Sequence, residues 1–325
     1  MTSQLDMFSG SSQAPRRPSS PTGRIRHVGS APDEAEMVQI LEVTGRYQIL
    51  RKLEPRAISP SPKPGYPLRG IILDTETTGL DARKDEIIEI GLIGFTFNDE
   101  GEIGDVTGVY GGLQQPTISI PMEVTRLTGI TDAMVLDQTI DMPRVRALIE
   151  PSNLIIAHNA SFDRPFCEAL SAIFSAKAWA CSNSEIDWSA RGYEGTKLGY
   201  LINQSGYFHV GHRAVDDCFA LLEVLALTRG DAEQTPFTEL YQASQRSRVR
   251  IFAENAPFDL KDVLKARSYR WSDGSDGRPK SWWIEIAEEA MDDELRFLRN
   301  EIYRWQDADP PVQRLTAFDR FKGQK

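Results

Sequence analysis

The sequence predicts an α/β protein with a mixed β-sheet covered by helices. Three segments with strand character come first, RGIILDTET, IIEIGLIGFTF and GDVTGVYGGL. The short apolar run NLIIAHN then precedes the helical spacing of SFDRPFCEALSAIF, and AVDDCFALLEVLAL shows the same spacing further on. Strands in series, followed by alternating strand and helix, indicate a mixed sheet with helices packed on it.

Composition limits the classes of protein to consider. The 325 residues are 40% hydrophobic and 26% charged, which suits one full-sized domain with smaller attachments. No apolar run approaches the roughly 20 residues that cross a bilayer, and no secretory signal begins the chain, so we expect a cytoplasmic protein without membrane contact. A net charge of −10 argues against coating nucleic acid by bulk electrostatics, but it is compatible with an acidic site that binds metal ions. The three cysteines lack metal-ligand spacing and are expected to be reduced: Cys167, Cys181 and Cys218.

Changes in composition along the chain predict its organisation. The start is rich in Ser, Pro and Arg and is expected to be disordered. A Pro-rich linker precedes the predicted sheet, and the pattern changes again after it. The predicted segments are a disordered tail (1–35), a helix and strand with the linker (36–65), the main domain (66–230), a connecting helix (231–245), a small α+β module of helix, hairpin and helix (246–305) and a polar tail (306–325).

Two acidic residues stand at the end of the first predicted strand, in ILDTETTGL. Asp74 and Glu76 are two residues apart, so both side chains leave the same face of the sheet. Because the strand that carries them is apolar, two neighbouring carboxylates are costly there unless a cation lies between them. Magnesium and manganese prefer oxygen ligands of this kind, so we expect a divalent metal site.

Two later segments add acidic residues and a histidine. Asp163, in HNASFD, lies near the start of a predicted helix that follows a buried strand. In HRAVDD, His212 stands five residues before Asp217, and a helix that starts between them places both at the same end. Four carboxylates and one histidine at the ends of elements suit phosphodiester hydrolysis with two divalent cations, in which the histidine accepts a proton from the attacking water.

These motifs carry a family resemblance. DTETTG, HNASFD and HRAVDD resemble the three motifs of the DEDDh 3′–5′ exonucleases, the group that includes the proofreading epsilon subunits of bacterial DNA polymerase III. The resemblance spans about residues 69 to 228, and it includes LTGITDAMV between the first two motifs. It implies a ribonuclease-H-like, mixed five-stranded sheet flanked by helices. It also implies that Asp74, Glu76 and Asp217 bind metal directly, that Asp163 holds the second ion directly or through water, and that His212 is the general base.

The spacing within the third motif distinguishes between neighbouring residues. The sister group has a tyrosine four residues before its last aspartate, where this chain has Arg213, so the histidine variant is favoured. Asp216 is a rival of Asp217 as a ligand, but one step along a helix turns a side chain by about 100°. His209 has Ala214 at the matching spacing and is expected to be a loop residue.

The resemblance also implies contacts with the substrate. Thr77, Thr78 and Leu80 would touch the terminal nucleotide, with Leu80 wedged against the last base, and Asn159 and Phe162 would line the other side. Ordinary packing is an equally good interpretation of Leu80 and Phe162. The expected substrate is single-stranded or frayed DNA, and a DNA polymerase subunit is a candidate partner. An RNA-processing exonuclease is an alternative, because no residue reveals how the sugar hydroxyl is treated.

The N-terminus carries a short apolar cluster, QLDMF. It resembles the sliding-clamp-binding peptide of bacterial replication and repair proteins. Leu5, Met7 and Phe8 would fill an apolar groove and Gln4 would supply a polar anchor. A chance apolar start would have the same letters, so both interpretations stay open.

The C-terminal module contains tryptophans among basic residues. Trp271, Trp282 and Trp283 either stack on a single strand of nucleic acid or form the core of a small module. Because Trp282 and Trp283 are neighbours on a predicted strand, they must face opposite sides of it. A non-catalytic adaptor that joins a clamp to DNA through the tail and this module is therefore a further alternative.

Overall fold

The computed structural model describes residues 33–228, 233–274 and 279–322, and the chain divides into two compact units, Met1–Ile49 and Leu50–Lys325. The described part of the first unit contains helix α1 (Glu34–Val43), which Asp33 caps by accepting a hydrogen bond from the Glu36 amide at 2.8 Å. The predicted clamp-binding peptide, Gln4–Phe8, and all but the last three positions of the predicted disordered tail lie outside the described residues.

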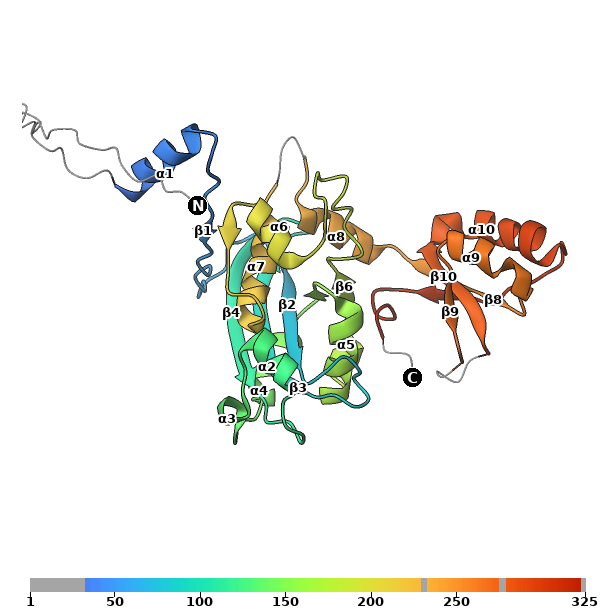
Figure 1. Ribbon diagram of the computed structural model, residues 1–325, viewed down its shortest axis with the longest axis horizontal. Coiled ribbons are helices and arrows are strands. Elements are labelled where there is room, and N and C mark those ends of the chain that lie inside the picture. Colours follow the sequence, from blue (N-terminus) through green and yellow to red (C-terminus); the bar gives the residue numbers. More distant parts are fainter. Residues whose placement is uncertain (1–32, 229–232, 275–278, 323–325) are drawn as a thin grey trace, which may run out of the picture. The chain divides into compact units, whose positions relative to one another are not determined.

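The second unit contains a mixed five-stranded sheet in the order β4-β3-β2-β5-β6 (Figure 1). The three long strands that come first in the sequence pair antiparallel, and the two short strands join them parallel to β2. This arrangement confirms the predicted mixed sheet flanked by helices. The strands are β2 (Leu68–Thr77), β3 (Ile87–Phe97), β4 (Ile103–Leu113), β5 (Leu154–Ala157) and β6 (Trp179–Cys181).

Helices cover both faces of this sheet because its central strands are apolar on both sides. Ile71 and Ile72 are neighbours on β2, and they belong to different core clusters, one on each face. Helices α6, α7 and α8 pack on the face of Ile72, and α4 and α5 pack on the face of Ile71. The helices are α2 (Met122–Thr128), α3 (Asp132–Val135), α4 (Met142–Ile149), α5 (Ala160–Leu170), α6 (Leu198–Gln204), α7 (Ala214–Ala226) and α8 (Pro236–Gln245), with a 3₁₀ turn η1 (Phe174–Ala176).

A short parallel pair joins β1 (Arg51–Lys52) to β7 (Tyr207–Phe208). Strand β1 is the strand expected within residues 36–65, and it pairs through two residues, Arg51 with Tyr207 and Lys52 with Phe208.

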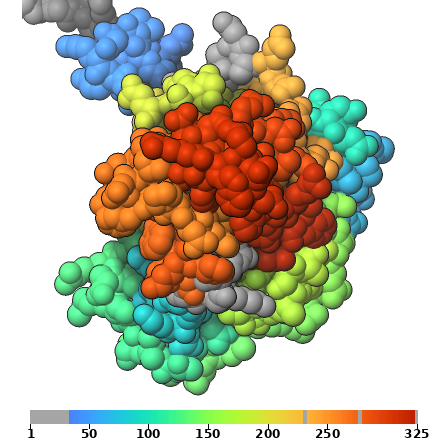
Figure 2. Space-filling model, turned by 90° about the vertical axis from the view of Figure 1, so that its right-hand side faces the viewer, coloured from blue at the N-terminus to red at the C-terminus, as the bar shows by residue number. Residues whose placement is uncertain are grey.

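The C-terminal module is a four-stranded antiparallel sheet in the order β11-β8-β10-β9, with helices packed on one face. Its side chains form one closely packed mass, orange to red in Figure 2. Its elements are β8 (Arg248–Glu254), η2 (Phe258–Leu260), α9 (Lys261–Ala266), β9 (Arg270–Ser272), β10 (Ser281–Ala287), η3 (Glu288–Ala290), α10 (Met291–Phe297), a π-helix η4 (Leu298–Tyr303) and β11 (Val312–Leu315).

The three tryptophans of the module occupy different environments. Trp282 packs against the core that the helices cover, and Trp271, 53% exposed, meets it edge to face at 5.4 Å between ring centroids. Trp283 leaves the opposite face, where the guanidinium groups of Arg250 and Arg270 lie 4.7 and 5.4 Å from its ring centroid. One tryptophan therefore belongs to the core, and the other two contribute to the surface of the module.

The end of the chain is not the polar tail that its composition suggested. Strand β11 pairs with β8, and the residues that follow return to the main sheet, where the Trp179 amide donates to the Ala317 carbonyl at 2.8 Å. Arg164, fully buried in α5, donates to the carbonyls of Arg320 and Phe318 at 2.6 and 2.7 Å. The segment is held in place because its backbone carbonyls satisfy a buried charge, and three of its side chains are buried: Leu315, Ala317 and Arg320.

Candidate active site

Strand β2 presents two carboxylates at one edge of the site. Asp74 and Glu76 are two positions apart on the strand, so their side chains leave the same face. Glu76 is 9% exposed, and the pairing of β2 with β3 shifts register immediately after it, between Glu76 and Thr77. Both acidic side chains therefore lie at the C-terminal end of β2.

Helix α7 brings a third carboxylate to the same place. Asp217, in the first turn of α7, has a carboxylate oxygen that lies with oxygens of Asp74 and Glu76 within 4.8 Å of one another. The helix can approach β3 this closely because Gly91 has no side chain. A Cβ atom there would lie 2.4 Å from the backbone carbon of Ala214. Three oxygen ligands from two segments fit a small hard cation such as magnesium or manganese.

The fourth acidic residue, Asp163, is hydrogen-bonded to Thr75 of the same strand, between Asp74 and Glu76 in the sequence. It lies in the first turn of α5, is 3% exposed, and accepts hydrogen bonds from the Thr75 amide at 3.1 Å and the Thr75 hydroxyl at 2.8 Å. It is not one of the three clustered carboxylates, but its charge raises the pKa of Asp74. The structure thus brings all four predicted acidic residues to one end of the sheet.

The pKa values of these carboxyls show how unfavourable the cluster is by itself. Burial, followed by repulsion from Asp217, Glu89 and Asp163, raises the pKa of Glu76 from 4.5 to about 8. Burial also raises the pKa of Asp163 to about 7, although hydrogen bonds from Thr75 oppose the change. The pKa of Asp74 lies well above its usual range for the same reasons, with burial first. A divalent cation would reverse these shifts, because it favours the charged form of every carboxylate around it.

The two histidines near the third motif lie in different environments. His209 is a loop residue, as expected, and its Nε2 lies 2.7 Å from Oδ1 of Asp217. His212 is exposed and has a φ of 62°, in the left-handed region. It immediately precedes Arg213, the N-cap residue of α7. His212 therefore lies exposed next to the N-terminus of α7.

Sequence reasoning missed Glu89 and Arg213. Glu89 is 5% exposed and lies directly opposite Glu76 across the β2–β3 pair. Arg213 Nη2 lies 2.8 Å from its Oε1. One signal was present in the sequence, since Glu89 is the only charged residue in the eleven-residue strand IIEIGLIGFTF. A charge inside a buried strand requires a partner.

The predicted substrate-contact residues fall into an exposed and a buried group. Leu80 is 87% exposed and Asn159 is exposed at the N-terminus of α5, so both are available to a ligand. Thr77 and Thr78 are buried, and their hydroxyls bond the Gly79 carbonyl and the Glu86 amide within their own loop. Phe162 is half-buried and packs against Phe166 with ring centroids 5.1 Å apart.

Comparison with known proteins identifies the class. The family model described as exonuclease matches residues 71–225. The chain is 32% identical over 166 residues to the DNA polymerase III subunit epsilon of Treponema pallidum, a match that covers 46% of this chain and 72% of that protein. The chain therefore belongs to the exonuclease family that includes this epsilon subunit, and it is a 3′–5′ exonuclease.

Other similar proteins are longer or more distant. DNA polymerase III PolC-type of Thermotoga maritima is 37% identical over 121 residues, which cover 36% of this chain and 8% of that protein. The structure titled Exonuclease X in complex with 5′ overhanging duplex DNA is 25% identical, with a TM-score of 0.36, and the match covers 52% of this chain and 99% of that one. The ssDNA complex of E. coli ExoI is 14% identical with a TM-score of 0.49, and the match covers 72% and 71% of the two chains.

The helices of the structure were compared with the length and apolar character that a membrane span requires. Among the residues that the structure describes, none of the helices combines the length and the apolar character needed to span a bilayer.

Proposed function

We propose that this chain is a cytoplasmic exonuclease that removes nucleoside monophosphates from the 3′ end of single-stranded or frayed DNA, in replication proofreading or DNA repair. The observation that carries this proposal is the meeting of Asp74, Glu76 and Asp217 within 4.8 Å at one end of the sheet. DNA is favoured over RNA because the similar proteins are named as DNA polymerase III subunits.

The four carboxylates suit two divalent cations. Asp74, Glu76 and Asp217 would hold one magnesium or manganese ion, and Asp163 would contribute to the second. When bound, the ions supply positive charge where the scissile phosphate gathers negative charge. Without them, the buried carboxylates would repel the phosphate of the substrate.

The remaining residues would bind and orient the DNA end. Leu80, exposed three residues after the end of β2, would pack against the last base, and Asn159 would contact the DNA strand from the start of α5. Thr77, Thr78 and Phe162 would shape the pocket behind them. His212 would accept a proton from the attacking water, and its exposure leaves it free to turn toward a bound phosphate.

The test is digestion of end-labelled single-stranded DNA and RNA of the same sequence, with magnesium, manganese or a chelator. Wild type, Asp217→Ala, His212→Ala and His209→Ala are compared after circular dichroism has shown that each is folded. We expect stepwise loss from the 3′ end of DNA that requires metal, Asp217 and His212. Faster digestion of RNA would favour the exoribonuclease. Full activity of His212→Ala, with loss in His209→Ala, would transfer the role of base to His209.

We also propose that QLDMF binds a bacterial sliding clamp, and that a DNA polymerase subunit is a second partner. The resemblance of the peptide to clamp-binding peptides supports the first, and the name of the Treponema relative supports the second. A clamp would raise the local concentration of the enzyme at DNA ends. Phe8→Ala should weaken binding to the clamp, whereas Ser9→Ala, the matched control, should not. Clamp binding without metal-dependent hydrolysis would favour the adaptor instead.

A further inference from the structure

Glu89 places a fifth carboxylate beside the four proposed metal ligands. It lies on β3 directly opposite Glu76, and directly opposed residues in an antiparallel pair have Cβ atoms about 5 Å apart. Its side chain is only 7% exposed, so water does little to screen its charge. A like charge this close is unfavourable unless a specific partner neutralises it.

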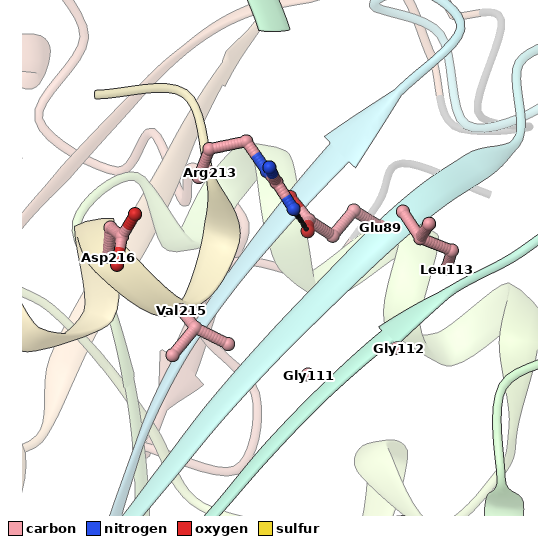
Figure 3. Close-up of a pocket in the computed structure, with 7 residues that line it drawn as sticks. All are labelled: Glu89, Gly111, Gly112, Leu113, Arg213, Val215 and Asp216. Atoms are coloured by element: carbon pink, nitrogen blue, oxygen red, sulfur yellow. Dashed lines mark hydrogen bonds and ion pairs between the residues drawn. The ribbon is translucent and has the colours of Figure 1, made fainter. Parts of the chain in front are cut away.

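Arg213 is that partner. Its Nη2 lies 2.8 Å from Oε1 of Glu89, and its Nε lies 3.2 Å from Oε2. The amide of Ala214 donates to Oε2 at 3.0 Å, so both carboxylate oxygens of Glu89 are engaged. Figure 3 shows the guanidinium of Arg213 directed at the Glu89 carboxylate, whereas the side chain of Asp216, in the first turn of α7, lies away from it.

The same arginine is linked to the catalytic end of α7. It occupies the N-cap position of the helix, and its backbone amide donates to Oδ2 of Asp217 at 3.2 Å. Its preceding neighbour is His212, which has a left-handed φ of 62°. A single residue thus connects the sheet, through Glu89, to both the proposed base and a proposed metal ligand.

Glycines at the edge of the sheet allow this close arrangement. Glu89, Arg213, Val215 and Asp216 line a cavity of about 310 Å³ with Gly111, Gly112 and Leu113. A Cβ atom on Gly111 would lie 2.7 Å from Cγ2 of Val215, so a larger residue there would force the Val215 side chain to shift. The cavity leaves the side chain of Arg213 40% exposed while that of Glu89 stays 7% exposed.

We propose that Glu89 and Arg213 are a positioning pair for the exonuclease reaction, which holds the first turn of α7, with His212 and Asp217, against the sheet. Arg213 also keeps Glu89 from becoming a further cation ligand. Four carboxylates balance the charge of two divalent cations, and Arg213 balances the fifth. This inference rests on the proposed function. Neither residue is assigned a contact with the reacting atoms.

The test compares Glu89→Gln, Arg213→Gln and the double variant with Arg146→Gln. Arg146 is an exposed arginine whose ion pair with Glu150, at 3.7 Å, is far weaker in geometry. We expect each single variant to lower kcat by about 100-fold while KM stays within about threefold, because displaced groups act mainly in the transition state. The double variant should regain about tenfold over Arg213→Gln, because it leaves no unpaired carboxylate. If Arg213→Gln does not fold, Arg213→Lys replaces it in the test. Lysine keeps the positive charge but loses the two-pronged contact, so its kcat should lie between that of wild type and the value expected for Arg213→Gln.

Two measurements are independent of activity. Hydrogen exchange of the metal-free proteins should become faster in residues 209–217 of both single variants and stay unchanged in Arg146→Gln. Calorimetric titration with manganese should show tighter binding by Arg213→Gln than by Glu89→Gln, because only the former frees a carboxylate. Unchanged exchange together with kcat within about twofold of wild type would overturn the proposal. An inactive wild type would refute the proposed function, and exchange and titration would still decide the role of the pair.

Discussion

The carboxylate cluster predicts how the stability of the metal-free protein depends on pH. Burial and the neighbouring charges of Asp217, Glu89 and Asp163 raise the pKa of Glu76 from 4.5 to about 8. A carboxyl whose pKa is raised on folding binds its proton more tightly in the folded state. Its contribution to the free energy of unfolding is therefore full below pH 4.5 and is lost as the pH rises through about 8.

The magnitude follows from the size of the shift. One pKa unit corresponds to about 1.4 kcal/mol, so the change in Glu76 would amount to roughly 5 kcal/mol above pH 8 if the site were dry. The site opens to solvent, which screens the charges, so we expect roughly 2 to 5 kcal/mol. A divalent cation should remove the loss, since it stabilises the ionised cluster.

The assay is denaturant unfolding of chelator-treated wild type and Glu76→Gln at about pH 5, pH 7 and pH 9. The comparison cancels the titration of distant groups and leaves that of Glu76 together with the carboxyl groups that it repels, such as Asp74. Glu76→Gln should become more stable relative to wild type as the pH rises, and saturating magnesium should restore wild type. A difference between the two proteins that is constant with pH, or that changes in the opposite direction, would refute the reasoning.

Three further predictions concern stability. Arg164→Met should lower the free energy of unfolding by about 3 to 5 kcal/mol, because it leaves buried partners unpaired, whereas Arg146→Met at an exposed pair should change it by less than about 0.5 kcal/mol. Gly91→Ala should lower the free energy of unfolding by about 1 to 3 kcal/mol and reduce activity, because its Cβ would meet the α7 backbone. Its control is Gly199→Ala in helix α6, where the space is open, so thermal unfolding should show unchanged or higher stability. Trp282→Ala should lower the stability of the C-terminal module by about 2 to 4 kcal/mol, measured by hydrogen exchange, because its ring packs against the core; protection equal to wild type would contradict this packing.

The fold and the acidic residues of the site could be predicted because their signals are local. Strand geometry places Asp74 and Glu76 on one face from their spacing alone, and the apolar runs and helical spacings that predict the mixed sheet each extend over fewer than about 15 residues. The three motifs then indicate one family, because their order and spacing agree. Comparison with known proteins confirms that family, and the structure confirms the mixed five-stranded sheet.

Other features depend on residues that are distant in the sequence. Glu89 and Arg213 are 124 positions apart, and Arg164 and the Arg320 carbonyl are 156 apart. His209 has the wrong spacing for the motif, but from the loop between β7 and α7 its Nε2 reaches Oδ1 of Asp217 at 2.7 Å. No periodicity along the chain encodes such pairs.

The sequence alone therefore specifies the class of protein, the strands and helices, and the chemical identity of the acidic residues. Only the tertiary structure decides which buried charges neutralise one another, how closely α7 approaches the sheet, and that Leu315, Ala317 and Arg320 near the C-terminus are buried. The physical reason is that the burial of an ionisable group becomes favourable only through a partner at hydrogen-bond distance. The position of that partner depends on how the whole chain packs.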